Sequence, residues 1–290
     1  MSSVPLVSTA AVGRPVAVAV PAWPALVSKR LSAIPKLAGV APASRLEVRP
    51  SPQMVPSGVR EIDALTGGLP RGCLTEICGP ASSGRTSVLL AAMAAATQRQ
   101  EVCALVDISD AFNPHSAAAA GVNFEKMLWV RCGENKQRTG SPQRRRVTEK
   151  NENARGQIER PVEQALRVTD LLLQSGGFGL VIIDLGDTPL KMARRIPLTS
   201  WFRFQRAVEH TSTVLFVVSQ VSCAQTCASL LLKVSGKRLS ALSHQLSARM
   251  PAHAQLLSGL QVQGELLRSR LERKPVGSVT AAFTTKVRTG

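Results

Sequence analysis

The sequence contains no tyrosine, and aromatic residues make up only 3% of its 290 residues. Proteins that bind single-stranded nucleic acid by base stacking present a series of aromatic side chains along a groove. A base-stacking platform is therefore improbable here. Any contact with DNA is expected to be mainly electrostatic and independent of base sequence.

Acidic residues are also scarce, with 19 Asp and Glu against 36 Lys and Arg. The resulting net charge of +17 and the isoelectric point near 10.8 are unusual for a metabolic enzyme. They favour a polyanionic partner, most simply the phosphate backbone of DNA. The alternative is a basic surface that is merely solvated.

Two further absences narrow the class of protein. No run reaches the roughly 18 apolar residues that a membrane-spanning helix requires, so a membrane protein is not expected. There is no CxxC pair among the six cysteines, most of which lie in apolar stretches, so we expect reduced, buried thiols in a cytoplasmic protein. The 44% hydrophobic content is enough for one large core.

The most informative stretch is Gly79-Pro80-Ala81-Ser82-Ser83-Gly84-Arg85-Thr86, which follows an apolar run and precedes a helical pattern. Its spacing matches the phosphate-binding loop G-x-x-x-x-G-K-[ST], except that Arg85 replaces the lysine. Backbone N–H groups of such a loop, together with the start of the next helix, bind phosphate. The alternative is a glycine turn without a ligand.

A second stretch fits the same site. Leu180-Val181-Ile182-Ile183-Asp184 is an apolar strand that ends in a carboxylate, which is the form of a Walker B element. We expect Asp184 to hold Mg²⁺ through water, opposite the hydroxyl of Thr86. The alternative is a core strand that happens to end in Asp.

The segment from Val55 to Gly72, with its Gly67-Gly68-Leu69-Pro70 turn, leads into the loop. Together with the loop, it resembles the RecA-like recombinases and their shorter ImuA-type relatives in mutagenic repair. The resemblance extends from about Val55 to Val234. It implies an α/β fold of the RecA-like P-loop NTPase type: a largely parallel twisted sheet flanked by helices, with a C-terminal β-hairpin.

The resemblance also implies roles for individual residues. ATP and Mg²⁺ are the expected cofactors, Asn113 lies where the family contacts adenine, and Gln220 matches the glutamine that reports the terminal phosphate. The catalytic candidates are Arg85, Asp184 and Gln220. The nucleotide-binding candidates are Gly79, Pro80, Ser82, Ser83, Gly84, Arg85, Thr86, Ser87 and Asn113, and the metal-binding candidates are Thr86 and Asp184.

Two departures from the family bear on activity. Ser109 stands where the family has the glutamate that activates water, and a hydroxyl without a partner base is a poor proton acceptor near neutral pH. Asp107 or Asp110 would have to act instead. The family's glycine-rich second DNA loop is essentially absent after Gln220, and the segment at the first DNA loop, from Gly186 to Pro197, is basic but short.

The expected organisation has three parts. Residues 1–45 form a flexible basic arm with one possible short helix, Ala25 to Leu37, and a transit peptide is the alternative. Residues 46–235 form the nucleotide-binding core, interrupted by a disordered basic insertion at 134–160 that either contacts phosphates or is solvated. Residues 236–290 form a basic hairpin that turns near Pro275-Val276-Gly277.

Two helices are expected within the core. One opens at Pro161, ends at Gly176-Gly177, and buries a face that includes Leu171. The members of that face are Val162, Leu166, Leu171 and Leu172. The other runs from Ser200 to Glu209, with Trp201, Phe202 and Val208 available for packing.

These observations favour a cytoplasmic, nucleoid-associated, ATP-binding DNA-repair protein that assists SOS or translesion mutagenesis with weak or no ATPase activity. The expected partner is DNA, and the candidate protein partners are a translesion DNA polymerase, a RecA-type protein or further copies of the chain. One alternative is an inactive RecA-fold adaptor that recruits a polymerase. An active recombinase would need the missing DNA loop, and a small-molecule kinase fits the basic charge least well.

Overall fold

The computed structural model describes residues 51–133, 153–239, 259–271 and 279–286. The chain divides into two units, residues 1–50 and residues 51–290, and every described residue belongs to the second. The predicted N-terminal arm with its short helix, the basic residues 134–152 and the hairpin turn near Pro275 lie outside the described residues.

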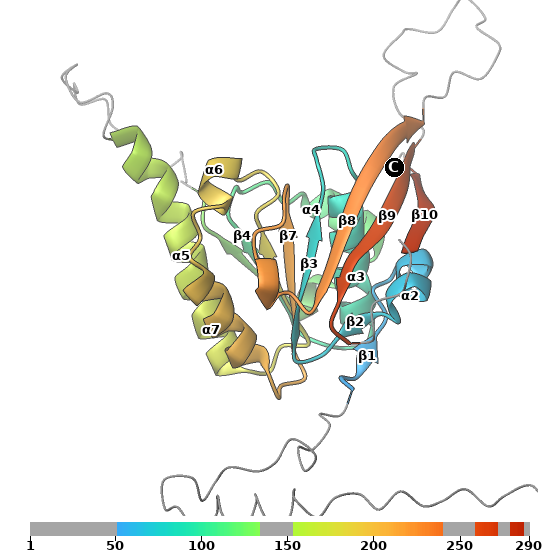
Figure 1. Ribbon diagram of the computed structural model, residues 1–290, viewed down its shortest axis with the longest axis horizontal. Helices are drawn as coiled ribbons and strands as arrows, with labels where there is room; N and C mark the ends of the chain where they lie inside the picture. Colours follow the sequence, from blue (N-terminus) through green and yellow to red (C-terminus); the bar gives the residue numbers. More distant parts are fainter. Residues whose placement is uncertain (1–50, 134–152, 240–258, 272–278, 287–290) are drawn as a thin grey trace, which may run out of the picture. The chain divides into compact units, whose positions relative to one another are not determined.

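An eight-stranded sheet organises the second unit (Figure 1), in the order β10-β9-β8-β3-β7-β6-β4-β5. All neighbours from β8 to β5 are parallel, whereas β9 and β10 run antiparallel at one edge. The predicted α/β fold with a largely parallel sheet is confirmed. The strands are β3 (Cys73–Cys78), β4 (Cys103–Asp107), β5 (Met127–Arg131), β6 (Leu180–Asp184), β7 (Val214–Ser219), β8 (Leu230–Leu239), β9 (Gly259–Ser269) and β10 (Val279–Lys286).

Helices cover both faces of this sheet, which explains why its central strands are apolar throughout. In β4, Leu105 packs on the face covered by α3, while Ala104 and Val106 pack on the face covered by α5 and α7. The helices are α2 (Arg60–Thr66), α3 (Arg85–Gln98), α4 (Pro114–Ala120), α5 (Asn153–Ser175), α6 (Leu190–Ala193) and α7 (Leu198–Val208). Short elements complete the chain: β1 (Met54–Val55), β2 (Leu69–Pro70), η3 (Phe124–Lys126) and η4 (Gln225–Cys227).

Helix α5 corrects two predictions. It begins at Asn153 rather than at Pro161, so the last part of the predicted insertion is helical and the proline lies inside the helix, where it removes one backbone hydrogen bond. The predicted end before Gly176 and Gly177 is confirmed, and both glycines have positive φ. Leu171 is 65% exposed because the buried face instead follows Val162, Ala165, Thr169, Leu172 and Leu173, at helical spacing.

In α7, Trp201 and Val208 are buried as predicted, but Phe202 is exposed. Phe204 takes its place, because residues 201, 204 and 208 lie on one face of the helix. Figure 1 shows α5 and α7 lying side by side, and the two helices are in contact. None of the described helices is long and apolar enough to cross a membrane.

The C-terminal hairpin is part of the central sheet. The predicted domain boundary at residue 235 falls inside β8, which continues to Leu239 and pairs with β9 along its length. Val262 on β9 and Phe283 on β10 are opposite each other and belong to the same buried cluster as α3. Helix α2 contacts both strands. The hairpin therefore completes the core on one side of the phosphate loop.

All six cysteines are free thiols, as predicted from their apolar surroundings. Five are buried and Cys73 is partly buried. Burial raises the pKa of Cys103 to about 12, and the negative charge of Glu101 acts in the same direction. These thiols therefore behave as apolar core groups at neutral pH.

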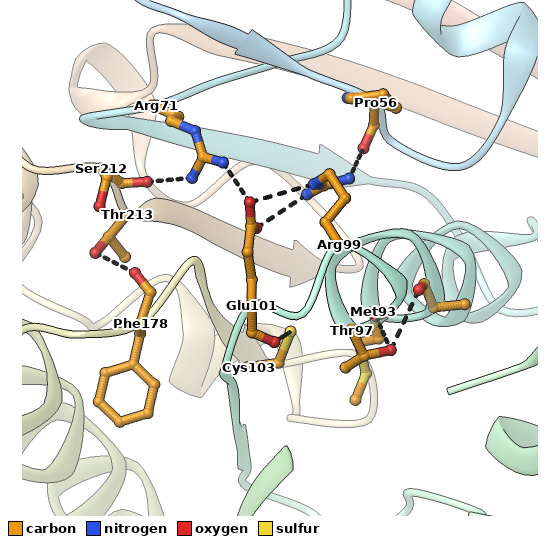
Figure 2. A network of polar contacts seen from close by, with 11 residues as sticks. Pro56, Arg71, Met93, Thr97, Arg99, Glu101, Cys103, Phe178, Ser212 and Thr213 are labelled. Atoms are coloured by element: carbon orange, nitrogen blue, oxygen red, sulfur yellow. Dashed lines mark hydrogen bonds and ion pairs between the residues drawn. The ribbon is translucent and has the colours of Figure 1, made fainter. Parts of the chain in front are cut away.

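A polar network centred on Glu101 joins the amino-terminal ends of the strands (Figure 2). The carboxylate accepts hydrogen bonds from Arg71 and from both Nε and Nη2 of Arg99, at 3.3 and 3.1 Å for the latter. Arg71 also donates to the carbonyl of Ser212, and Arg99 donates to the carbonyl of Pro56. One carboxylate thus connects three segments that are remote in sequence.

We predict that Glu101→Gln lowers the free energy of unfolding at pH 7 by about 1–2 kcal/mol, because both arginines lose their charged partner. Burial acts to raise the pKa of Glu101, but the hydrogen bonds and charges of Arg99 and Arg71 outweigh it and lower the pKa. The contribution is therefore present above the unfolded-state pKa near 4.3 and is lost as the pH falls through the lower folded-state value. Urea unfolding at pH 7 and pH 3 measures this, with the exposed Glu163→Gln as control. Equal stabilities of the Glu101 variant and the wild type at pH 7 would contradict it.

Candidate nucleotide-binding site

The loop between β3 and α3 has the backbone of an anion-binding turn. Ser82 and Gly84 both have positive φ, at 58° and 92°. Gly79 has no room for a side chain, because a Cβ there would lie 2.2 Å from the carbonyl oxygen of Val234 and 2.8 Å from Ser83 Oγ. Such alternation of backbone conformation directs successive N–H groups into one concavity.

The start of α3 completes this concavity. Gly84 is the N-cap residue, and no side chain caps the first turn. Arg85, Thr86 and Ser87 occupy that turn, whose N–H groups have no partner inside the helix. The hydroxyl of Ser83 is buried and has no hydrogen-bond partner among the described residues. An uncapped helix start beside an unsatisfied hydroxyl fits a phosphate group.

Two strands from the C-terminal part form a wall behind the loop. A Cβ at Gly236 of β8 would lie 2.2 Å from the carbonyl oxygen of Ser82. A Cβ at Gly84 would lie 2.4 Å from a methyl carbon of Val262 on β9. The loop is therefore in close contact with both strands, and its shape depends on them.

A pocket of about 110 Å³ opens beside the start of α3. It brings together four of the predicted site residues, which are Arg85, Thr86, Asn113 and Asp184. The other predicted loop residues, from Gly79 to Gly84, and Ser87 do not line it. The lining consists of Arg85, Thr86, Leu89, Leu90, Ala111, Phe112, Asn113, Ser116, Asp184, Gly186, Asp187 and Val218.

Arg85 is buried and points toward the end of β6. Its Nη1 donates a hydrogen bond of 3.3 Å to the carbonyl oxygen of Gly186. Burial lowers the pKa of the Arg85 guanidinium, while the charges of Asp184 and Asp187 oppose this effect. The arginine is therefore a counter-ion for the carboxylates of this strand end.

Asp184 is partly buried at the end of β6, where its Oδ1 accepts a 2.8 Å hydrogen bond from the N–H of Gly186. Burial raises its pKa to about 6, and the negative charges of Asp107 and Asp187 add to the rise. The hydrogen bond and Arg85 only partly compensate. The charged form of Asp184 thus costs stability, as is common for carboxylates kept for binding or catalysis.

Gln220 lies directly after β7 and meets the same backbone unit. Its Nε2 donates a 2.9 Å hydrogen bond to the carbonyl oxygen of Gly186. The three predicted catalytic residues, Arg85, Asp184 and Gln220, are therefore all bonded to Gly186. Gln220 itself does not line the pocket.

Neither Ser109, which occupies the position of the family's general base, nor the nearby Asp107 is a free proton acceptor. Ser109 is exposed and does not line the pocket. Asp107 is buried and accepts hydrogen bonds from the N–H groups of Ala111 and Phe112 and from Trp129 Nε1, at 3.0 to 3.2 Å.

Asp110 forms a two-point ion pair with Arg131, at 2.6 and 2.5 Å. The hydrogen bond from Arg131 lowers the pKa of Asp110, which makes it a weaker base. The guanidinium of Arg131 also lies 5.0 Å from the ring centre of Trp129. Asp107 and Asp110, the two aspartates that could replace the family's glutamate as general base, are therefore both engaged by other groups.

Asn113 lies at the rim of the pocket and caps α4, accepting a 3.1 Å hydrogen bond from the N–H of Ser116. This bond uses its carbonyl oxygen and leaves its NH₂ group as a donor. Phe112, Leu89, Leu90 and Val218 provide apolar surface nearby. The rim can therefore offer one polar contact and an apolar floor to a purine.

The sequence reasoning missed Glu76, which is fully buried in β3. Its carboxylate accepts hydrogen bonds from the segment after β7. The donors are the hydroxyls of Ser219 and Ser222, the backbone N–H groups of Cys223 and Ala224, and the thiol of Cys223. A carboxylate inside an apolar strand was the signal available in the sequence. Glu76 connects the strand of the phosphate loop to the segment that carries Gln220.

The pocket also contains a residue that carried no sequence signal, Asp187. Thr86 and Asp184 present a hydroxyl and a carboxylate to the same pocket, which is the oxygen chemistry that Mg²⁺ prefers. The residues present therefore fit a nucleoside triphosphate with its Mg²⁺. Thr86 and Asp184 would hold the metal, and the loop with the start of α3 would hold the phosphates.

Comparison with known proteins supports a RecA-like chain. Residues 26–139 match the RecA N-terminal domain family. Protein RecA of Kineococcus radiotolerans is 29% identical over 209 residues, which cover 66% of this chain and 52% of that protein. Protein RecA of Levilactobacillus brevis is 28% identical over 194 residues, which cover 61% and 43%. The chain spans about half the length of the curated relatives it matches.

We predict that Asp184→Asn raises the free energy of unfolding at pH 8 by about 1–3 kcal/mol, since the raised pKa marks a charge that destabilises the fold. The folded state binds a proton at Asp184 between the unfolded-state pKa near 3.9 and the folded-state value of about 6. The wild type should therefore lose stability relative to the variant as the pH rises through this window. Below pH 4 the two should be equally stable. Urea unfolding across the range tests this, and a variant that is less stable at pH 8 would refute it.

We also predict that Gly236→Ala lowers the free energy of unfolding by about 1–3 kcal/mol, because the new methyl group would overlap the backbone of Ser82. Gly264→Ala in β9 is the matched control, since its methyl group would meet only the carbonyl oxygen of Ala281, at 3.8 Å. That variant should stay within about 0.5 kcal/mol of the wild type. Equal effects of the two substitutions in chemical denaturation would show that the loop does not depend on close contact with β8.

Proposed function

We propose that this chain is a RecA-like DNA-repair protein that binds ATP with Mg²⁺, hydrolyses it slowly or not at all, and assists mutagenic, translesion-type repair. The observation that carries the proposal is the state of the proton acceptors beside the pocket. Ser109 offers only a hydroxyl, Asp107 accepts three hydrogen bonds, and Asp110 is paired with Arg131. Groups that can bind a nucleotide are therefore present, whereas the segment from Asp107 to Asp110, where the family's general base would lie, offers no free carboxylate to activate water.

The nucleotide would be held by the residues that fit it. The uncapped start of α3 would bind its phosphates, and Asn113 would contact the base. Bound Mg²⁺ would neutralise part of the phosphate charge. Gln220 and Arg85 would keep the Gly186 backbone in place beside the terminal phosphate, through the bonds they donate to its carbonyl.

A role as an active recombinase is not favoured. The connection from Gln220 to Ser229 is fully described, and its only regular element is η4. Its first half is bonded to the buried Glu76. Such a short and internally bonded connection leaves no segment to wrap a DNA strand.

DNA binding would instead be electrostatic. Lys191, Arg194 and Arg195 are exposed on and just after α6, which follows β6 in the chain. The basic residues 144–146 lie outside the described part of the chain. Contacts of this kind weaken steeply with salt and do not read base sequence. A polymerase, a RecA-type protein or further copies of the chain remain the proposed protein partners.

The second candidate function is an adaptor that does not use nucleotide. One observation favours it: Nη1 of Arg85 donates a hydrogen bond to the Gly186 carbonyl, and the guanidinium also feels the negative charges of Asp184 and Asp187. Such an arginine would have to be redirected before it could bind a phosphate. Equilibrium binding separates the two functions.

We predict that a fluorescent ATP analogue with Mg²⁺ binds the folded full-length chain saturably and that unlabelled ATP displaces it. The phosphate loop and the carboxylate of Asp184 provide the required groups. Thr86→Ala should weaken binding about tenfold or more, because the metal loses a ligand. Absence of saturable binding at millimolar nucleotide would leave the adaptor as the function.

We further predict that Ser109→Glu combined with Arg85→Lys increases single-turnover ATP hydrolysis by tenfold or more, since a general base typically contributes about 10²–10⁴-fold. The matched control is Ser109→Gln with Arg85→Lys, which has a side chain of the same size but no base. Rapid hydrolysis by the unaltered chain would show that the proposal is wrong about the missing base.

A further inference from the structure

Asp187, which the sequence reasoning did not single out, lines the same pocket as Arg85, Thr86 and Asp184. We infer that Asp187 makes nucleotide binding at this site strictly dependent on a divalent cation, by excluding triphosphate that carries no metal. This inference rests on the proposed function, because it concerns the specificity of the proposed ATP site.

The backbone fixes the position of Asp187. It occupies the third position of a turn closed by a 3.0 Å hydrogen bond from the N–H of Thr188 to the carbonyl oxygen of Leu185. Leu185 and Thr188 are buried, and the N–H of Leu185 donates a 2.8 Å hydrogen bond to the carbonyl oxygen of Val218. The first residue of the turn is thus bonded to β7 and its last residue is buried, whereas Asp187 is exposed.

The second residue of the turn is held just as firmly. The carbonyl oxygen of Gly186 accepts hydrogen bonds from Arg85 and Gln220, at 3.3 and 2.9 Å, and its N–H donates to Asp184. A methyl group on Gly186 would lie 2.9 Å from Asp184 Oδ1, so the turn packs tightly on that carboxylate. Asp187 therefore stays at the pocket, because the turn that carries it cannot swing away.

The charges of the pocket lining favour a triphosphate that carries a divalent cation over a metal-free triphosphate. Its charged lining residues are one arginine and two aspartates, so the formal charge is −1. Arg85 already interacts with both carboxylates and with the Gly186 carbonyl. A metal-free triphosphate would meet two carboxylates in a partly desolvated pocket, where like charges repel strongly. A divalent cation reverses this balance and gains carboxylate oxygens as ligands.

The carboxylate of Asp187 is available to repel a metal-free triphosphate and to attract a cation, whereas the other aspartates nearby accept hydrogen bonds from the chain. Asp107 and Asp110 are engaged by hydrogen bonds from the chain, and Asp184 accepts one from Gly186. Asp187 accepts no hydrogen bond from the described residues and is exposed to the pocket. Its charge is felt by both Arg85 and Asp184.

The test compares the dissociation constant of ATP in excess Mg²⁺ with that in EDTA, at pH 8, for the full-length chain. The wild type should bind Mg²⁺-ATP far more tightly than metal-free ATP. In Asp187→Asn the ratio of the two constants should fall about tenfold, because one repulsive charge has been removed. Asp187→Glu retains the charge and should keep the wild-type ratio. The remote, exposed Glu125→Gln controls for net charge and should also keep it.

The outcomes separate this inference from the function on which it rests. If the wild type does not bind Mg²⁺-ATP, the proposed function fails and the inference fails with it. If the wild type binds but Asp187→Asn keeps its Mg²⁺ dependence, the inference alone is overturned. Should Asp187→Asn fail to fold by circular dichroism, Asp187→Ser provides the same measurement, and an unchanged ratio in that variant overturns the inference equally.

Discussion

The buried carboxylate of Glu76 is the interaction on which the arrangement of the site depends. A charge taken out of water is tolerated only when hydrogen bonds replace its hydration, and here the segment from Ser219 to Ala224 supplies them. The same interaction sets the course of the chain after β7. It therefore fixes the position of Gln220, which directly follows β7. Gln220 in turn holds the backbone of Gly186 through the hydrogen bond to its carbonyl oxygen. Loss of this single carboxylate would leave several buried donors unsatisfied at once.

The carboxylates on and just after the parallel strands divide into two groups. Asp107, Asp110 and Glu76 are engaged by the chain and serve structure, each through several hydrogen bonds or an ion pair. Asp184 and Asp187 line the pocket together with Arg85, and their charges act on its guanidinium. Because the first group is engaged, the aspartates that follow β4 are not free to activate water. The second group gives the pocket lining a formal charge of −1 together with Arg85, which is the basis of the proposed preference for a triphosphate that carries a metal.

Local patterns in the sequence were enough to predict the strand, loop and helix around Gly79 and the strand ending at Asp184, whereas the parallel α/β fold was implied by the resemblance to RecA-like proteins. They succeed because an apolar run bounded by glycines is specified within a few residues. They fail where the deciding contact is remote. The partners of Glu76 lie about 145 residues away in sequence, and Val234, which closes on Gly79, lies about 155 residues away. A proline suits the first turn of a helix, so the sequence predicts that α5 begins at Pro161, whereas the helix begins at Asn153. The sequence also predicts that Leu171 is buried, but the buried face of the helix contains Thr169 instead.

The wall that β8 and β9 form behind the phosphate loop has a consequence for biosynthesis. Gly79 and Gly84 are made early, whereas Val234, Gly236 and Val262, which pack against them, are made late. Until the C-terminal strands leave the ribosome, the loop has no surface to close on, although its own sequence is complete. The nascent chain must therefore carry this loop in an unfinished form until the C-terminal strands have been made. The loop reaches its final shape only after Val262 has been translated.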